Sequence, residues 1–127
     1  MIRYVGDARV AAFVSKALGI SLVPPFTSMG IERDGEIVAG IVFNVFEGAD
    51  VHVTIAGRGF TRGFLAEMGH YVFDQLGCER MTGQTEQPKI VRLAERCGGQ
   101  IEGLKRNHFG KGRDAYLVGI LKEEWKF

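Results

Sequence analysis

Residues 50–76 read DVHVTIAGRGFTRGFLAEMGHYVFDQL. Polar and apolar residues alternate from Asp50 to Ala56, which is the pattern of a strand with one buried face. Glycines and arginines follow, and from Leu65 to Leu76 the apolar residues recur at helical spacing. Backbone N–H groups and the helix dipole favour phosphate at such a strand-to-helix junction. The stretch therefore predicts either a phosphate-binding loop or an ordinary turn with solvated arginines.

The glycine-rich turn differs from two familiar phosphate-binding motifs. A dinucleotide-binding fingerprint needs a glycine where this chain has Arg62. A P-loop ends in Gly-Lys followed by Ser or Thr, and this turn does not. A phosphate bound here would be held by backbone amides, with the cations of Arg58 and Arg62 nearby.

The remaining pattern predicts helices alternating with strands. A helix is expected over residues 7–18, because Asp7 can cap its start and Gly19 can end it. Asp34-Gly35 is a strong two-residue hairpin signal between strands. The other expected elements are strands over 27–33, 36–46 and 80–85, a helix from Pro88 to Gly98, and a closing hairpin over 100–109 and 115–121. This order predicts an α/β (α+β) fold, with a mixed, largely antiparallel central sheet and helices on both faces.

Length and composition limit the classes of protein to consider. The 127 residues suit a single domain over residues 1–127. The formal net charge of +1 argues against nucleic acid or an anionic membrane as a partner. The apolar runs are far shorter than the roughly 20 residues of a spanning helix, and the N-terminus does not resemble a secretory signal. Cys78 and Cys97 are isolated, so the reducing cytoplasm is the expected compartment.

Few other residues point to chemistry. The three histidines lack metal-ligand spacing, so no metal is expected. His70 is interpreted as a surface residue and Cys97 as a buried thiol. His52, on the strand before the glycine-rich turn, is either a packed histidine or a general base. A basic cluster is either a solvated hairpin tip or a patch for an acidic substrate or a phosphate tail; its members are Lys105, Arg106, His108, Lys111 and Arg113.

Four stretches carry a family resemblance: residues 58–63, 64–81 and 87–98, and the closing hairpin over 102–121. In this order they resemble the GNAT superfamily of acyl-CoA-dependent N-acetyltransferases, and more narrowly its phage-associated and ribosomal-protein-acetylating type. Arg58 and Gly63 match the family's pyrophosphate loop, Gln/Arg-x-x-Gly-x-Gly/Ala, and Thr61 replaces its first glycine. The similarity covers about residues 50–125, and the first half of the chain fits by the order of its elements.

The resemblance implies that acetyl-CoA binds as a substrate beside the strand that ends near Ala56. The implied reaction transfers the acetyl group directly to a primary amine of a small molecule or protein terminus. Backbone near Ile55 would hold the pantetheine arm, and amides of the following turn would hold the pyrophosphate. The implied cofactor-binding residues are Ile55, Ala56, Gly57, Arg58, Gly59, Phe60, Thr61, Arg62, Gly63 and Gln87. An exposed sheet edge near the closing hairpin predicts a homodimer.

The catalytic groups are not fixed by a family motif. Ala94 stands where many members carry a tyrosine that protonates the departing thiolate. The attacking amine must lose a proton, and His52 is the first candidate for the base, with Glu32 second. Tyr116 is a candidate proton donor by residue type alone. Two alternatives stay open: a CoA-binding or partner-binding module without catalysis, and a nucleic-acid-associated protein that uses the basic hairpin.

Overall fold

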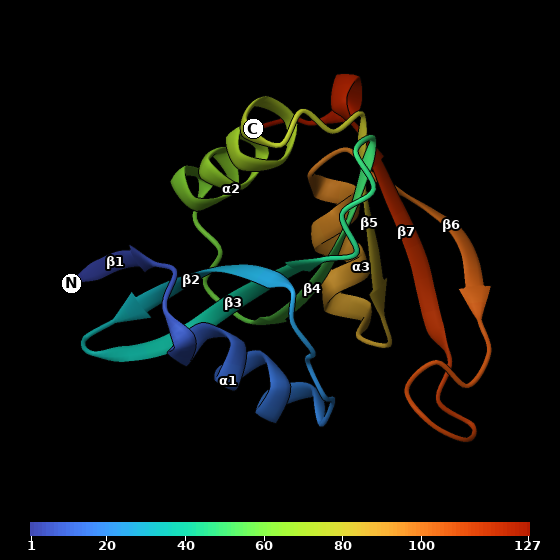
Figure 1. Ribbon diagram of the computed structural model, residues 1–127, viewed down its shortest axis with the longest axis horizontal. Coiled ribbons are helices and arrows are strands. Elements are labelled where there is room, and N and C mark those ends of the chain that lie inside the picture. Colours follow the sequence, from blue (N-terminus) through green and yellow to red (C-terminus); the bar gives the residue numbers. More distant parts are fainter.

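The computed structural model describes residues 1–127 and contains a 7-stranded sheet in the order β1-β2-β3-β4-β5-β7-β6 (Figure 1). Only β4 and β5 are parallel neighbours, and every other pair is antiparallel. The strands are β1 (Ile2–Val5), β2 (Phe26–Arg33), β3 (Glu36–Asn44), β4 (Asp50–Gly57), β5 (Arg80–Thr85), β6 (Gln100–Lys105) and β7 (Ala115–Leu121). The mixed, mainly antiparallel sheet confirms the predicted fold class.

The helices lie on both faces of this sheet. The α-helices are α1 (Ala8–Leu18), α2 (Arg62–Gly69) and α3 (Pro88–Arg96); α2 continues as a π-helical segment, η1 (His70–Gln75), and a 3-10 turn, η2 (Lys122–Glu124), lies near the C-terminus. Figure 1 shows α1 on the side of the sheet opposite α2 and α3. None of the helices is long and apolar enough to span a bilayer.

Helix α1 packs closely because glycines lie beneath it. Val10 and Val14 are fully buried, and a Cβ on Gly40 would come within 3.0 Å of Val10 and 2.9 Å of Val14. The predicted caps of this helix are confirmed, since the Asp7 side chain accepts from the Arg9 amide and Gly19 takes a left-handed conformation. Glycines in the sheet thus allow the helix to approach its backbone.

The opposite face holds the main apolar core. Phe64, Leu65 and Met68 of α2 are buried against β3 and β4, in a cluster that also includes Cys97 of α3. The prediction of a buried thiol at Cys97 is therefore confirmed, and burial raises its pKa to about 11. His70 lies on the surface beside Asp74, as predicted, with 59% of its side chain exposed.

The predicted order of elements was incomplete. It omitted β1, whose four residues are mostly exposed and carry no alternating pattern of burial. The strand expected over 100–109 ends at Lys105, because Asn107 has a φ of 57° and its side chain accepts a bond from the Gly112 amide. The hairpin at Asp34-Gly35 is confirmed, with φ values of 51° and 86°.

Candidate active site

The central strands β4 and β5 pair along only part of their length. Their register runs from Asp50 opposite Arg80 to Val53 opposite Gly83 and stops there. Beyond this point β4 remains paired with β3 on its other side, and β5 remains paired with β7. The facing edges therefore separate, and their backbone N–H and C=O groups are free to bond a ligand that enters between them.

The turn after β4 carries unpaired amides to this opening. The Arg58 amide donates to the Val38 carbonyl at 3.0 Å, which ends the pairing of β4 with β3. Gly59 follows with a φ of 80°, a conformation that favours glycine. The amides of Gly59 and Phe60 donate no hydrogen bond within the protein. The turn that the sequence predicts as an anion-binding loop therefore has two backbone amides that can donate to a ligand.

Thr61 is the N-cap of α2. Its side chain accepts from the Phe64 amide at 3.0 Å and lies 2.5 Å from the Tyr4 hydroxyl. A Cβ on Gly63 would meet that hydroxyl at 2.8 Å. The threonine that replaces a family glycine therefore has a structural role, and Tyr4 of β1 covers one side of the helix start.

A basic hollow of about 480 Å³ lies between the turn and α3. Its cations are Arg58 from the turn and Lys89, Arg92 and Arg96 from α3, and no carboxylate lines it. None of these four side chains takes part in an ion pair within the chain. The three cations of α3 were not predicted as binding residues, although their spacing places them along one side of a helix. The hollow suits a ligand with several negative charges.

Four of the ten predicted cofactor-binding residues line this hollow, Gly57, Arg58, Gly59 and Phe60, and Arg62 and Gln87 are among the six that do not. The Arg62 guanidinium stacks on the Phe127 ring, 5.2 Å from its centroid, and lines a neighbouring hollow together with Arg96 and Lys126. Gln87 is the N-cap residue of α3 but makes no side-chain capping bond, and it lines neither hollow. Arg62 can add positive potential at the rim, whereas only the backbone of its helix turn faces a ligand.

An apolar cavity of about 30 Å³ lies where α3 crosses the separated strands. Ile55 of β4 and Thr85 of β5 line it from the two edges, and Ala94 lines it from the helix. Ala56 points the other way and is buried beside Val14 under α1. The cavity shares the lining residues Ile90 and Leu93 with the basic hollow, and Ala94 contributes no hydroxyl group to it.

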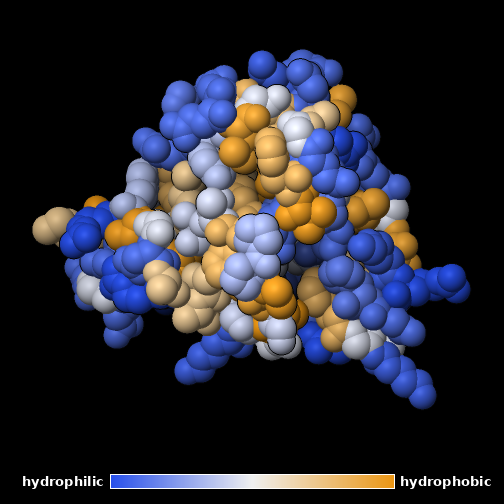
Figure 2. All heavy atoms as spheres, in the orientation of Figure 1, coloured by the Kyte–Doolittle hydropathy of each residue, from blue (hydrophilic) through white to orange (hydrophobic).

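A polar hollow of about 400 Å³ opens on the α1 face of the sheet. Its polar lining comes from Ser21, Asn44, His52, Thr54, Gln84, Lys105 and His108. Figure 2 shows this surface hollowed between the part of the molecule that holds α1 and the part that holds β6 and β7. Since the strand edges separate immediately beyond Val53, this hollow and the apolar cavity lie on opposite faces of one opening in the sheet.

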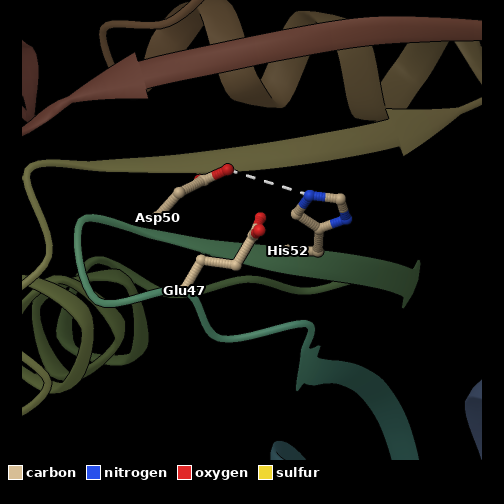
Figure 3. A group of neighbouring side chains, drawn as sticks. All are labelled: Glu47, Asp50 and His52. Carbon is tan, nitrogen blue, oxygen red and sulfur yellow. Dashed lines mark ion pairs between the residues drawn. The ribbon is translucent and has the colours of Figure 1, made fainter.

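His52 lies next to two carboxylates. Its Nε2 atom is 3.7 Å from Oδ2 of Asp50, and Figure 3 shows Glu47 on the same side of the ring, with the second ring nitrogen turned away from both acids. Asp50 also accepts a hydrogen bond from Thr82 at 2.8 Å, which fixes its position. The acids can stabilise a protonated imidazole, and the free nitrogen can exchange a proton with a ligand.

The same three side chains form a cluster that the sequence did not predict. One ligand atom from each of Glu47, Asp50 and His52 can be chosen so that all lie within 4.8 Å of one another. Such a set could hold a divalent cation, or it could serve only to orient the imidazole. The cluster was missed because Glu47 belongs to the turn before β4 and not to the strand pattern.

The other two predicted catalytic residues lie away from His52. Glu32 is at the far end of β2 and pairs with Arg9 at 2.7 Å, whereas His52 is level with the beginning of that strand. Tyr116 pairs with Thr85, and this register places it on the opposite face of the sheet from His52. The structure therefore brings only His52 of the three to the polar hollow.

A mixed sheet that opens between two central parallel strands, with a helix start at the opening, defines the GNAT N-acetyltransferase fold. Three solved structures from Vibrio cholerae share it with this chain. A mutant form of the spermidine/spermine N-acetyltransferase SpeG has a TM-score of 0.73 at 16% identity, covering 97% of this chain and 96% of that one. Spermidine N-acetyltransferase in complex with CoA and spermine has a TM-score of 0.71 at 14% identity, with coverages of 97% and 96%. SpeG in complex with manganese ions has a TM-score of 0.70 at 17% identity, with coverages of 96% and 93%.

The amino-acid sequence of this chain does not reveal a relative. No model of a known protein family matches the chain, and no curated protein matches it. The similarity to the acetyltransferases is therefore one of fold.

Proposed function

We propose that the protein is an N-acetyltransferase that moves the acetyl group of acetyl-CoA to a primary amine. The observation that carries this proposal is the opening between β4 and β5. The basic hollow lies at the turn after β4, and the polar hollow lies on the α1 face of the sheet, where the two strands part. A long ligand fits this arrangement if its anionic phosphates lie in the basic hollow and its reactive group lies near the polar hollow. The GNAT fold supports the same reaction.

In this proposal the diphosphate of acetyl-CoA lies in the basic hollow. The free amides of Gly59 and Phe60 donate to it, and Arg58 and Arg92 supply positive charge. The pantetheine arm then follows the unpaired edge of β4 past Ile55, where its amides replace the hydrogen bonds that β5 does not make. The thioester reaches the region where the two strands part.

The amine acceptor enters from the polar hollow and attacks the thioester carbon. A new C–N bond forms, the C–S bond breaks, and the amine proton passes to His52 directly or through a water molecule. Asp50 and Glu47 stabilise the resulting imidazolium. The departing thiolate regains a proton from solvent or from a nearby donor. Tyr116 remains the candidate donor from the sequence, although no described hollow includes it.

A second candidate function is a CoA-binding module without catalysis. Ala94 favours it, because the apolar cavity has no hydroxyl group at the position where many GNAT enzymes carry a tyrosine. Both functions predict CoA binding, and only the first predicts turnover. The phage-associated, ribosomal-protein-acetylating subtype and a homodimer formed through β6 remain proposals of the same kind.

The experiment that separates the two functions is a measurement of free CoA released from acetyl-CoA in the presence of a panel of primary amines. The proposal predicts release that depends on both the amine and the protein, with the acetylated amine detected by mass spectrometry. Tight acetyl-CoA binding with no turnover on any amine would favour the module. Absence of any acetyl-CoA binding would exclude both functions.

A further inference from the structure

We propose that the acceptor is an amine that also carries an anionic group, and that Lys105 and His108 bind that group. This inference deepens the proposed transferase function and rests on it for the reaction, although the binding preference can be measured separately. The observation that carries it is one hollow lined by His52 of β4, by Lys105 at the end of β6, and by His108 in the loop between β6 and β7.

The ionisable groups that line this hollow are His52, Lys105 and His108, and none of them is a carboxylate. The acid that pairs with His52 also has other partners. Asp50, beside His52, accepts from Thr82 and also lies 3.7 Å from the Arg80 guanidinium. An acceptor with several positive charges and no negative one would meet Lys105 without any lining carboxylate to balance it.

Hydrogen bonds within the loop after β6 fix the position of His108, and Lys105 precedes this loop at the end of β6. The Asn107 amide donates to Asp114 at 2.9 Å, and its side-chain oxygen accepts from the Gly112 amide at 2.8 Å. The Phe109 amide donates to the Arg113 carbonyl at 3.0 Å, and Arg113 is paired with Glu86, just before α3. The basic side chains are therefore placed by the fold and do not belong to a free tail.

The surroundings of His108 change its pKa. Burial, Lys105 and His52, in that order, hold the pKa of His108 below its usual range. A positive field of this kind favours a bound carboxylate or phosphate. Asp50 and Glu47 lie beside His52 and suit the amine end of the acceptor. The hollow itself thus carries Lys105 and the two histidines, and the two carboxylates lie outside its lining, beside His52.

The volume of about 400 Å³ suits a small molecule. Figure 2 shows the hollow open to solvent on this face, so a free amine of this size can enter it. Of the five basic-cluster residues singled out in the sequence, only Lys105 and His108 line it.

The test compares matched amines on the full-length protein with acetyl-CoA: 4-aminobutyrate with butylamine, O-phosphoethanolamine with ethanolamine, and spermidine as a polycation. We expect kcat/KM to be about fivefold or more higher for at least one anionic member than for its neutral-chain partner. The two pairs distinguish carboxylate from phosphate. Lys105→Glu should remove or invert the preference. Lys111→Glu, on the same loop but outside the lining, should keep it.

The inference would be overturned if neither anionic amine had a higher kcat/KM than its neutral-chain partner, or if spermidine had a higher kcat/KM than both anionic amines. The same amines are also titrated against the CoA-bound protein by ligand-observed NMR, which needs no turnover. Preferential binding of an anionic amine without any transfer would support the inference and contradict the proposed reaction. Transfer to amines without such a preference would support the proposed reaction and contradict the inference.

Discussion

Val53 of β4 and Gly83 of β5 form the last paired position between the two parallel strands. One residue before it, His52 faces the polar hollow, and two residues after it, Ile55 lines the apolar cavity. The end of this ladder therefore places the proposed base beside the point where a ligand can cross the sheet.

Removing cations from the basic hollow should weaken CoA binding. We expect the double variant Arg58→Ala with Arg92→Ala to raise the Kd for CoA about tenfold, because both side chains line the hollow and neither has an ion-pair partner. Isothermal titration calorimetry at low salt measures this change. The double variant Lys16→Ala with Lys111→Ala removes the same charge away from the hollow and should leave the Kd unchanged. An equal rise in Kd for both double variants would mean that the net charge of the protein, and not the position of these cations, determines CoA binding.

Gly59 should be required for ligand binding more than for stability. Gly59 and Gly77 both have positive φ values, 80° and 72°, and neither has an atom within 3.8 Å of an added Cβ. Ala at either position should therefore strain the backbone to a similar degree, at a cost of about 1 kcal/mol. Only Gly59→Ala should shift the free amides and raise the Kd for CoA several-fold. Melting temperatures supply the stability comparison, and a loss of affinity in Gly77→Ala as large as in Gly59→Ala would count against a role for the turn.

His52 should matter for turnover and not for CoA binding. We expect His52→Gln to lower kcat by about 100-fold or more, the usual effect of removing a general base, with the Kd for CoA preserved. His70→Gln alters an exposed histidine on η1 and serves as the matched control. A steady-state assay on the best amine of the panel measures both variants. A kcat for His52→Gln within a few-fold of the wild-type value would assign proton removal to another group.

The low pKa of His108 predicts a loss of stability in acid. The unfolded chain takes up a proton at this residue near pH 6.5, whereas the folded protein does so only at lower pH. Below about pH 6.5 the unfolded state therefore binds more protons, and the free energy of unfolding falls as the pH falls through the folded pKa. His108→Asn should show a smaller drop in melting temperature between about pH 7.5 and 5.5 than the wild type. A drop of the same size in both proteins would contradict the assigned environment.

Much of the fold could be predicted because its signals are local. Asp7 and Gly19 mark the ends of α1, Asp34-Gly35 marks a hairpin, and the alternation from Asp50 marks β4. The short strand β1 carries no such signal, since its residues are mostly exposed and owe their strand to pairing with β2. The family resemblance implied a ligand beside the strand that ends near Ala56, but no local pattern of residues specifies the separation of β4 from β5.

The candidate site could be predicted only where it lies on one stretch of chain. The glycine-rich turn and His52 are close in sequence, so the alternation of β4 and the turn were enough to single them out. Arg92 and Lys105 come to the site from other elements, through tertiary packing that the sequence pattern does not encode. Glu32 has the right chemistry for a base, but the register of β2 places it at the other end of the strand, beside Arg9.

A crystal structure of the protein soaked with acetyl-CoA tests the central claim most directly. The account predicts density for the diphosphate against the amides of Gly59 and Phe60, with the thioester between β4 and β5, within reach of the hollow that contains His52. Density for the coenzyme elsewhere on the surface, or crystals that bind none at saturating concentration, would contradict it.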